Sequence, residues 1–376
     1  MKRETRILFQ PPNTIGVGHI SRLVAIAQEV RNLDTSSESL FLIEGHGHDI
    51  PESAGFPTVN MSTVEEAWSS WDFLKRKRFQ AEFYRELLCS YRPQLILFDC
   101  IPSNILFDAV VENGIPFAIC VRKCKDMPFY YQCNHEALSV ATRLLIAHDP
   151  DEVSIPDELR DRAVFVGRIV RRWTGQLYSR ENDRSKLLVI TGGGGGYPNT
   201  VEFYNLALQA FQILSDTADW RAVLIAGPLF RDWLSLQHVS GARVAPFLPD
   251  VQSLFAIADV VVCQAGYNTV AEILETGARA VAVPAPRWLD DQYHRAASVS
   301  AVHTGFKVFS GGDASLLANA IASLAAEPGP VGRPGAAPNG ATLAAETLLQ
   351  LAVGGDQSGL TIAAPSDGNR VSKVSR

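Results

Sequence analysis

The sequence predicts an α/β fold made of two domains with parallel sheets, and three observations support this prediction. Short apolar, β-branched runs alternate with helix-length patterns along the chain, which is typical of βαβ units. The chain has 376 residues, more than one hydrophobic core usually supports. Residues 168–184 are polar and basic and lack apolar periodicity, so we expect a linker there that forms the floor of an interdomain cleft.

Each half of the chain supplies its own series of predicted strands. The first domain, residues 1–167, is expected to contain strands at residues 6–9, 40–43, 95–98, 117–121, 144–146 and 164–166. The second domain, residues 185–326, is expected to contain strands at residues 186–190, 222–225, 242–244, 260–262 and 280–283. Residues 327–353 are predicted to form a connection and a last helix from Ala341, and residues 354–376 a disordered tail.

The composition is that of an ordinary globular protein and disfavours several classes. Hydrophobic residues make up 47% and charged residues 20% of the chain, and the net charge of −6 gives no broad basic footprint for nucleic acid. No stretch approaches the roughly 20 apolar residues of a membrane span, and the N-terminus does not resemble a secretory signal. The six cysteines include no C-x-x-C pair, so we expect reduced thiols in a cytoplasmic protein.

Two groups of residues could be considered as metal ligands. Cys133 with His135, and Glu44 with His46 and His48, do not complete a four-ligand pattern, so we expect no metal. The sequence does not indicate an oligomeric state.

A short basic run, residues 75–78, lies in a helical pattern predicted at residues 64–88. It is either the solvated face of an amphipathic helix or a surface that faces a membrane or an acceptor.

A glycine turn after the first strand carries the first candidate for chemistry. Gly16-Val17-Gly18-His19 opens a helix, but the third glycine of a dinucleotide fingerprint is missing. No acidic residue is expected at the end of the second strand either, so a nicotinamide enzyme is disfavoured. The helix dipole favours a neutral imidazole at His19, which can accept a proton. The alternative is a histidine that packs the turn or binds an anion without proton transfer.

Two further polar residues end strands of the first half. Asp99 follows the strand at residues 95–98, at the carboxyl edge where open α/β sheets bind ligands. Three roles are open for Asp99: orienting His19, acting as the base itself, or capping the following turn. Arg122 ends the next strand and is a candidate for contact with an acceptor, with a surface salt bridge as the alternative.

The second half contains two loops suited to a nucleotide. Thr191 and the glycines at residues 192–196 lie between a predicted strand and helix, where backbone N–H groups can bind phosphate. A flexible hinge is the alternative, and the missing Lys-Ser/Thr of a P-loop disfavours ATP hydrolysis. The segment at residues 246–250 precedes another helix, and its free backbone groups can bond a nucleobase edge.

The most informative segment is Gln264-Ala265-Gly266-Tyr267-Asn268-Thr269-Val270-Ala271-Glu272, followed by Asp290-Asp291-Gln292. A buried strand leads into the small-residue turn, and a helix is predicted to start near Asn268 and Thr269. Glu272 is expected in the first turn of this helix, where it can accept hydrogen bonds from ribose hydroxyls. Complementing the helix dipole is its alternative role.

Together these motifs resemble the MurG-like glycosyltransferases of the GT-B superfamily, most closely their uncharacterised bacterial branch, over roughly residues 5–310. The resemblance implies two Rossmann-like domains with parallel sheets facing across a cleft. It also implies an inverting, metal-independent transfer of a sugar from a nucleoside-diphosphate donor to a small-molecule acceptor. We further expect a use in natural-product biosynthesis. Alternatives on the same fold are a sugar-nucleotide hydrolase or epimerase, and a non-catalytic nucleotide-sugar-binding protein.

The resemblance also implies roles for single residues. Glu272 would bind the ribose, and the Leu248 backbone, beside Phe247, would read the base. Asp291 and Gln292 would bind the sugar hydroxyls. His19 and Asp99 would be the catalytic residues, with Arg122 on the acceptor side. Contacts to the donor diphosphate would come from the remaining set: Gly18, Arg168, Gly192, Gly193, Gly194, Gly195, Gly266, Tyr267, Asn268 and Thr269.

Two features depart from the family pattern. Gln264-Ala265 stands where MurG-type sequences have a serine or an arginine-serine pair, so one hydroxyl contact to the phosphates is lost. The loop that binds a lipid-linked acceptor is not recognisable, which argues against a peptidoglycan acceptor.

Overall fold

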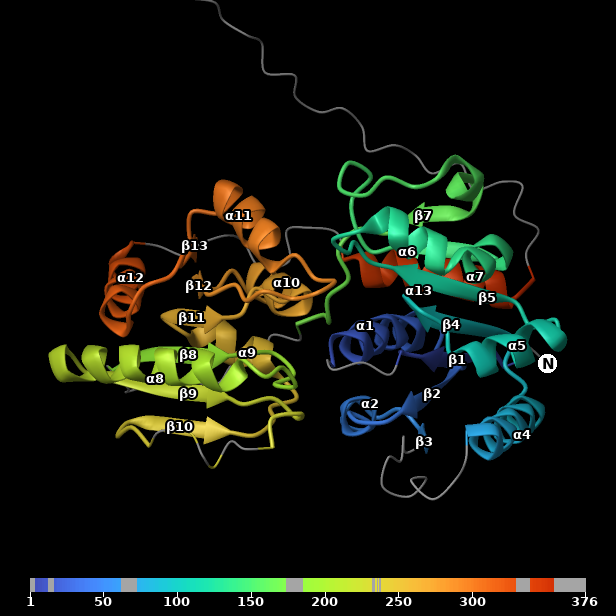
Figure 1. Cartoon of the computed structure of the whole chain (residues 1–376), viewed down its shortest axis with the longest axis horizontal. Helices are drawn as coiled ribbons and strands as arrows, with labels where there is room; N and C mark the ends of the chain where they lie inside the picture. Colours follow the sequence, from blue (N-terminus) through green and yellow to red (C-terminus); the bar gives the residue numbers. More distant parts are fainter. Residues whose placement is uncertain are drawn as a thin grey trace, which may run out of the picture.

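A computed structural model of the chain describes residues 4–12, 17–61, 73–173, 185–231, 234, 236, 238–328 and 339–354. Two parallel sheets lie side by side, each with helices on both faces (Figure 1). This is the two-domain α/β architecture that the sequence predicts. The predicted linker beyond residue 173 and the predicted tail beyond residue 354 lie outside the described residues.

The first sheet has seven parallel strands in the order β3-β2-β1-β4-β5-β6-β7. Each predicted run of the first half forms a strand, and the short strand β3, with its mixed polar sequence, was not predicted. The strands are β1 (Arg6–Gln10), β2 (Glu38–Glu44), β3 (Thr58–Met61), β4 (Leu95–Asp99), β5 (Phe117–Val121), β6 (Arg143–Ile146) and β7 (Ala163–Phe165).

Alternating side chains of this sheet build two cores. Ile7 and Phe9 of β1 face one core, whereas Leu8 faces the other, as the two-residue period of a strand requires. The first core is covered by α1 (Gly18–Leu33), α2 (Asp49–Ser53) and α13 (Gly340–Ala352). The second is covered by α4 (Phe73–Tyr91), α5 (Asn104–Glu112), α6 (Met127–Cys133) and α7 (His135–Val140), with the 3₁₀ helix η1 (Asp157–Arg162).

The last described helix, α13, returns to the first domain. Its alanine and leucine face packs against α1 in the first core, and Figure 1 shows it behind the N-terminal sheet. The first strand and the last described helix therefore belong to the same domain.

The second sheet has six parallel strands in the order β10-β9-β8-β11-β12-β13. Its strands are β8 (Lys186–Thr191), β9 (Trp220–Ile225), β10 (Ala242–Ala245), β11 (Val260–Cys263), β12 (Ala280–Ala282) and β13 (Phe306–Val308), of which β13 was not predicted. The helices α8 (Thr200–Thr217) and α12 (Ala314–Ala326) cover one face. The helices α9 (Val251–Ile257), α10 (Tyr267–Thr276) and α11 (Gln292–Val302) cover the other.

Two local expectations change with the structure. β2 extends to Glu44, so the expectation that no acidic residue ends this strand is wrong; its carboxylate accepts a hydrogen bond from the Tyr84 hydroxyl at 2.5 Å. The basic run at residues 75–78 lies on α4, where Lys75, Lys77 and Arg78 are exposed, as on the solvated face of an amphipathic helix. Within the described ranges, no helix is both long enough and apolar enough to cross a bilayer.

Candidate functional site

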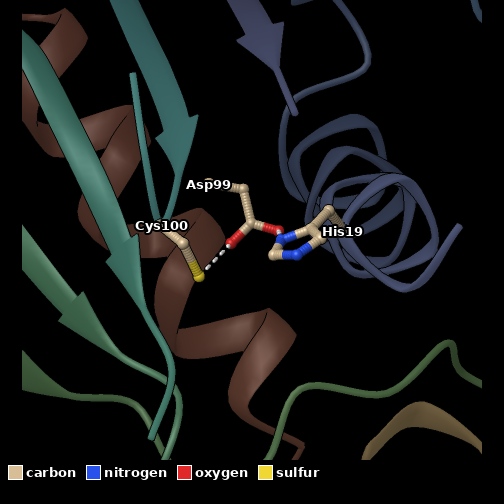
Figure 2. A group of neighbouring side chains, drawn as sticks. All are labelled: His19, Asp99 and Cys100. Atoms are coloured by element: carbon tan, nitrogen blue, oxygen red, sulfur yellow. Dashed lines mark hydrogen bonds and ion pairs between the residues drawn. The ribbon is translucent and has the colours of Figure 1, made fainter. Parts of the chain in front are cut away.

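His19 and Asp99 meet at the centre of the first sheet. β1 and β4 are neighbours, and the connections that follow them run to opposite sides of the sheet. Open α/β sheets bind ligands outside the carboxyl ends of such a strand pair. His19 lies in the first turn of α1, after β1, and Asp99 ends β4 (Figure 2). The His19 Nδ1 atom is 3.1 Å from Asp99 Oδ2.

Arg22 completes this cluster from the next turn of α1. Its Nη2 donates to Asp99 Oδ1 at 2.8 Å and to Oδ2 at 2.6 Å, and both side chains are buried. Although burial alone would raise the pKa of Asp99, the positive charge of Arg22 and the neighbouring His19 lower it to about 2. Asp99 is therefore an anion at neutral pH, which argues against its acting as the base.

The geometry favours His19 as a neutral base. Burial lowers the pKa of His19 below its usual value of 6.5, and Asp99 opposes this shift only in part. His19 Nδ1 lies near both Asp99 Oδ2 and Arg22 Nη2, at 3.1 and 3.2 Å. In the tautomer with the proton on Nδ1, the ring donates to Asp99 and Nε2 can accept a proton from a substrate. Of the three roles that the sequence left open for Asp99, this contact is the one that orienting His19 requires.

Cys100 lies next to this pair, and its Sγ is 3.5 Å from Asp99 Oδ1 (Figure 2). His19, Asp99 and Cys100 are close enough together to be considered as metal ligands. However, Arg22 already occupies both carboxylate oxygens of Asp99, and burial raises the pKa of the Cys100 thiol to about 12. The donor set is therefore better suited to proton transfer than to holding a cation.

The glycine loop after β8 is packed tightly. The Gly192 N–H donates to the Tyr204 hydroxyl at 3.1 Å, and the Gly193 N–H donates to Thr191 Oγ1 at 3.3 Å. Gly195 has φ +79°, and a Cβ there would lie 2.5 Å from the Ala226 carbonyl. Two of the N–H groups predicted to bind phosphate thus donate hydrogen bonds within the domain. At position 195, the lack of space for a side chain explains why the residue is glycine.

The loop also reaches the first domain. A Cβ on Gly194 would lie 3.0 Å from the Val17 side chain, at the turn that opens α1. Gly16 of that turn lies outside the described residues.

The segment at residues 264–272, here called the donor motif, contacts the turn that opens α1. Gly266 precedes α10 as its N-cap residue, and Asn268 Nδ2 donates to the Gly18 carbonyl at 2.7 Å. Asn268 Oδ1 is buried and has no partner among the described residues. Thr269 is half-buried, with its Oγ1 near Gly193. Gly18 of the first domain and Gly193, Asn268 and Thr269 of the second therefore lie close together.

Glu272 lies in the second turn of α10, not the first as expected, because the helix already begins at Tyr267. Dipole complementation therefore does not explain it, since that effect is confined to the first turn. Its buried carboxylate is 3.4 Å from Arg171, and burial raises its pKa against the opposing charge of Arg171. Arg171 also donates to the Pro249 carbonyl, which links Glu272 to the predicted base-reading segment.

That segment has no regular secondary structure, as predicted. Phe247 packs against the core of the first domain, whereas Leu248 packs against the core of the second. The segment therefore lies at the interface of the domains.

Arg122 forms an interdomain ion pair rather than the surface salt bridge that was its alternative role. Its Nη1 is 2.6 Å from Asp290 Oδ1, and both side chains are largely buried. Asp290 also binds Arg295 of α11, and the neighbouring Lys125 Nζ donates to the Arg287 carbonyl at 2.7 Å. Asp290 and Arg295 were not predicted as site residues; the acidic pair Asp290-Asp291 was the available signal.

Three other predicted donor residues have structural partners in this state. Asp291 accepts a hydrogen bond from the His294 N–H and caps α11, and Gln292 Oε1 accepts one from the Ala285 N–H. The Tyr267 hydroxyl donates to the Ala147 carbonyl of the first domain at 2.7 Å. Arg168, by contrast, is exposed.

Known glycosyltransferases resemble this chain in sequence. Residues 188–329 match the glycosyltransferase family 28 C-terminal domain. A curated relative from Polaromonas naphthalenivorans (strain CJ2) is 29% identical over 184 residues. It is the UDP-N-acetylglucosamine--N-acetylmuramyl-(pentapeptide) pyrophosphoryl-undecaprenol N-acetylglucosamine transferase, and the match covers 46% of this chain and 50% of that protein. The chain thus spans about half the length of this relative.

Solved structures show the same fold over most of the chain. The glycotransferase of kitacinnamycin superposes with a TM-score of 0.59 at 17% identity, covering 94% of this chain and 95% of the other. MurG from Acinetobacter baumannii superposes with a TM-score of 0.56 at 16% identity, covering 92% and 99%. The second half of the chain therefore carries a glycosyltransferase family 28 C-terminal domain, at residues 188–329, and the chain has the two-domain fold of these solved glycosyltransferases.

Proposed function

We propose that this protein is an inverting, metal-independent glycosyltransferase that moves a sugar from a nucleoside-diphosphate donor to a small-molecule acceptor. The observation that carries the proposal is the position of the His19–Asp99 pair. It lies in the first domain beside Gly18, whose carbonyl accepts the hydrogen bond from Asn268 of the donor motif. A proton acceptor in one domain thus faces a nucleotide-binding motif in the other.

The proposed step is a single displacement at the anomeric carbon. An acceptor hydroxyl transfers its proton to His19 Nε2 while its oxygen attacks this carbon from the side opposite the donor phosphate. The bond to the acceptor oxygen forms, the bond to the diphosphate oxygen breaks, and the nucleoside diphosphate leaves with the electron pair. Asp99 stabilises the imidazolium that forms, and the configuration of the anomeric carbon inverts.

Metal independence is supported by the charges of the site. Arg22 neutralises Asp99, and Asp290 is neutralised by two arginines, which disfavours both carboxylates as cation ligands. The developing charge on the leaving group would then be stabilised by helix N-termini and cationic side chains. Transfer activity that survives dialysis against EDTA is the expected result, and loss that Mg²⁺ or Mn²⁺ restores would refute this part.

A small-molecule acceptor, in natural-product biosynthesis, is supported by the missing lipid-acceptor loop in the sequence. The curated relative is named for an undecaprenol-linked acceptor, and the kitacinnamycin enzyme for a natural product. Assays with water-soluble aglycones and with a lipid-linked muramyl acceptor would compare the two classes directly.

Release of nucleoside diphosphate from UDP-, GDP- and dTDP-sugars tests the reaction class. A glycosyltransferase releases it at a rate that depends on the acceptor and gives a product of inverted configuration. Acceptor-independent release would identify a hydrolase instead. Binding of nucleotide without any turnover would identify a non-catalytic binding protein.

Replacing the proposed base tests the mechanism. We predict that His19→Ala lowers kcat by about 10²- to 10⁴-fold, as expected for loss of a general base, while donor affinity is largely kept. Steady-state rates and calorimetric binding of the nucleoside diphosphate provide the two readouts. His135→Ala, at an exposed position of α7, is the matched control and should change neither. Wild-type kcat in His19→Ala would assign His19 a structural role.

A further inference from the structure

The second sheet also has two neighbouring strands whose following connections lead to opposite edges of the sheet. β8 and β11 are neighbours, with β9 and β10 beyond β8 and with β12 and β13 beyond β11. The crevice outside the carboxyl ends of β8 and β11 is therefore the expected ligand position in this domain, as that of β1 and β4 is in the first. One arginine from a third connection spans this crevice.

Arg287 lies between β12 and α11, and only 8% of its surface is exposed. Its Nη1 donates to Asn199 Oδ1 at 2.6 Å, and its Nη2 donates to Gln264 Oε1 at 2.9 Å. Asn199 is the N-cap residue of α8, which follows β8 and the glycine loop, and Gln264 directly follows β11. The guanidinium also stacks on the Tyr197 ring, 3.7 Å from its centroid. Arg287 is thus fixed between the two sides of the crevice.

The hydrogen-bond partners of Arg287 carry no charge, and Asp290, the carboxylate whose charge acts on it, is already paired with Arg122 and Arg295. Both hydrogen-bond acceptors are neutral amides, and no carboxylate of the described residues forms an ion pair with it. Its Nε is buried without a hydrogen-bond partner among those residues. The other deeply buried arginine, Arg22, contrasts with this because it binds both oxygens of Asp99. Burying an uncompensated cation is costly, so such a group is kept where an anion binds.

A second unpartnered group belongs to the residue that follows Asn199 in the chain. Thr200 is the first residue of α8, and its Oγ1 is buried with no partner in the described part of the chain. α8 has 18 residues, and its N-terminus carries a partial positive charge. A buried cation and the N-terminus of a long helix, whose cap residue Asn199 binds that cation, therefore lie at one crevice, which matches the chemistry of a phosphate ligand.

We propose that Arg287 is the cationic group that receives the donor diphosphate and stabilises the charge of the departing nucleoside diphosphate. The inference rests on the proposed function and adds to it a residue that the sequence motifs did not indicate. The planar guanidinium is held by amides on two of its nitrogens, so its positive charge is fixed in position at the crevice.

Calorimetric titration of Arg287→Gln against the wild type tests this role. The probes are UDP, GDP and dTDP, the corresponding nucleosides, and inorganic pyrophosphate. We expect Arg287→Gln to weaken the nucleoside diphosphate that binds the wild type best by about 10- to 100-fold, as for loss of one charge-assisted contact. Binding of the matching nucleoside should not change, and pyrophosphate binding should weaken with the diphosphate.

The matched control is Arg221→Gln, at the opposite edge of the same sheet, where the side chain is 61% exposed. It should bind all probes as the wild type does. Unchanged diphosphate affinity in Arg287→Gln would overturn the inference, as would equal weakening of nucleoside and nucleoside diphosphate.

Circular dichroism first establishes that the variant folds. If Arg287→Gln does not fold, Arg287→Lys decides: weaker diphosphate binding with unchanged nucleoside binding supports the role, and wild-type affinity for both overturns it. A wild type that binds diphosphate but never transfers sugar contradicts the proposed function alone, and a wild type that binds none of the probes contradicts both.

Discussion

Asp99 shows how a single buried charge is balanced in this protein. Its side chain is fully buried, and Arg22, three residues beyond His19 on α1, binds both of its oxygens. The ion pair therefore connects the end of β4 to α1 and holds the carboxylate that orients His19. Removing one partner from such a pair leaves a buried charge without compensation.

We predict that Asp99→Asn lowers the free energy of unfolding by about 3–5 kcal/mol, because Arg22 is left as a buried, unpaired cation. Urea denaturation followed by circular dichroism measures this change. The double variant Arg22→Met/Asp99→Leu should recover most of the loss, since apolar side chains need no partner there. If the double variant is less stable than Asp99→Asn, the ion pair contributes more than charge compensation.

The same pair predicts how stability depends on pH. The pKa of Asp99 is lowered to about 2 in the folded protein, below its value of about 3.9 in an unfolded chain. The ionised carboxylate therefore stabilises the fold above about pH 4, and this contribution is lost as the pH falls towards 2.

At the scale of elements, the glycine loop after β8 shows why a ligand-binding motif also has steric requirements. Gly195 and Gly227 both have positive φ angles, and neither position has room for a Cβ: one on Gly195 would lie 2.5 Å from the Ala226 carbonyl oxygen, and one on Gly227 would lie 2.3 Å from the Gly193 carbonyl oxygen. The Leu229 N–H also donates to the Gly194 carbonyl, which ties the loop to the segment after β9. The flexible-hinge interpretation does not fit a loop packed in this way.

We predict that Gly195→Ala destabilises the protein by clearly more than Gly114→Ala. Both glycines have positive φ, +79° and +60°, so both substitutions introduce backbone strain of about 1–2 kcal/mol. A Cβ at position 195 would also lie 2.5 Å from the Ala226 carbonyl, whereas at position 114 nothing lies within 4 Å. Thermal unfolding of the two variants gives the comparison, and equal losses would show that the loop moves to accommodate the methyl group.

At the scale of the whole molecule, a small number of polar contacts hold the domains together around the site. Arg122 binds Asp290, and the Lys125 N–H donates to the Leu289 carbonyl at 2.9 Å. The Tyr267 hydroxyl accepts from the Ile169 N–H and donates to the Ala147 carbonyl, so α10 is attached to the first domain at its first residue.

We predict that Arg122→Met loosens the interface without unfolding either domain. Asp290 keeps Arg295 as a partner, so no buried carboxylate is left uncompensated. Hydrogen exchange of the peptide containing Lys125 should become faster, because its N–H bonds across the interface. Arg160→Met removes an exposed ion pair with Asp157 and is the control that should leave this exchange unchanged. Equal exchange in both variants would show that Arg122 does not maintain the interface.

Much of the fold could be predicted from local patterns. Every predicted strand run forms a strand, because a buried parallel strand requires a continuous apolar run that is visible in the sequence. The short strands β3 and β13 escaped because β3 mixes polar with apolar residues and both have few residues to show a pattern. The helix start before Glu272 was misplaced by one to two residues, which was enough to put the carboxylate in the wrong turn.

The candidate site, like the fold, was predictable only in part. The sequence by itself determined which residues end or follow the strands of each sheet, so the positions of His19, Asp99 and the α10 motif beside these strand ends could be predicted from local order alone. Only the tertiary structure decided their partners, because Gly18 and Asn268 are 250 residues apart in the chain and Arg122 and Asp290 are 168 apart. Such contacts are set by how two rigid domains dock, and local spacing does not distinguish the carboxylate of Asp290, which crosses the interface, from that of Asp291, which caps a helix.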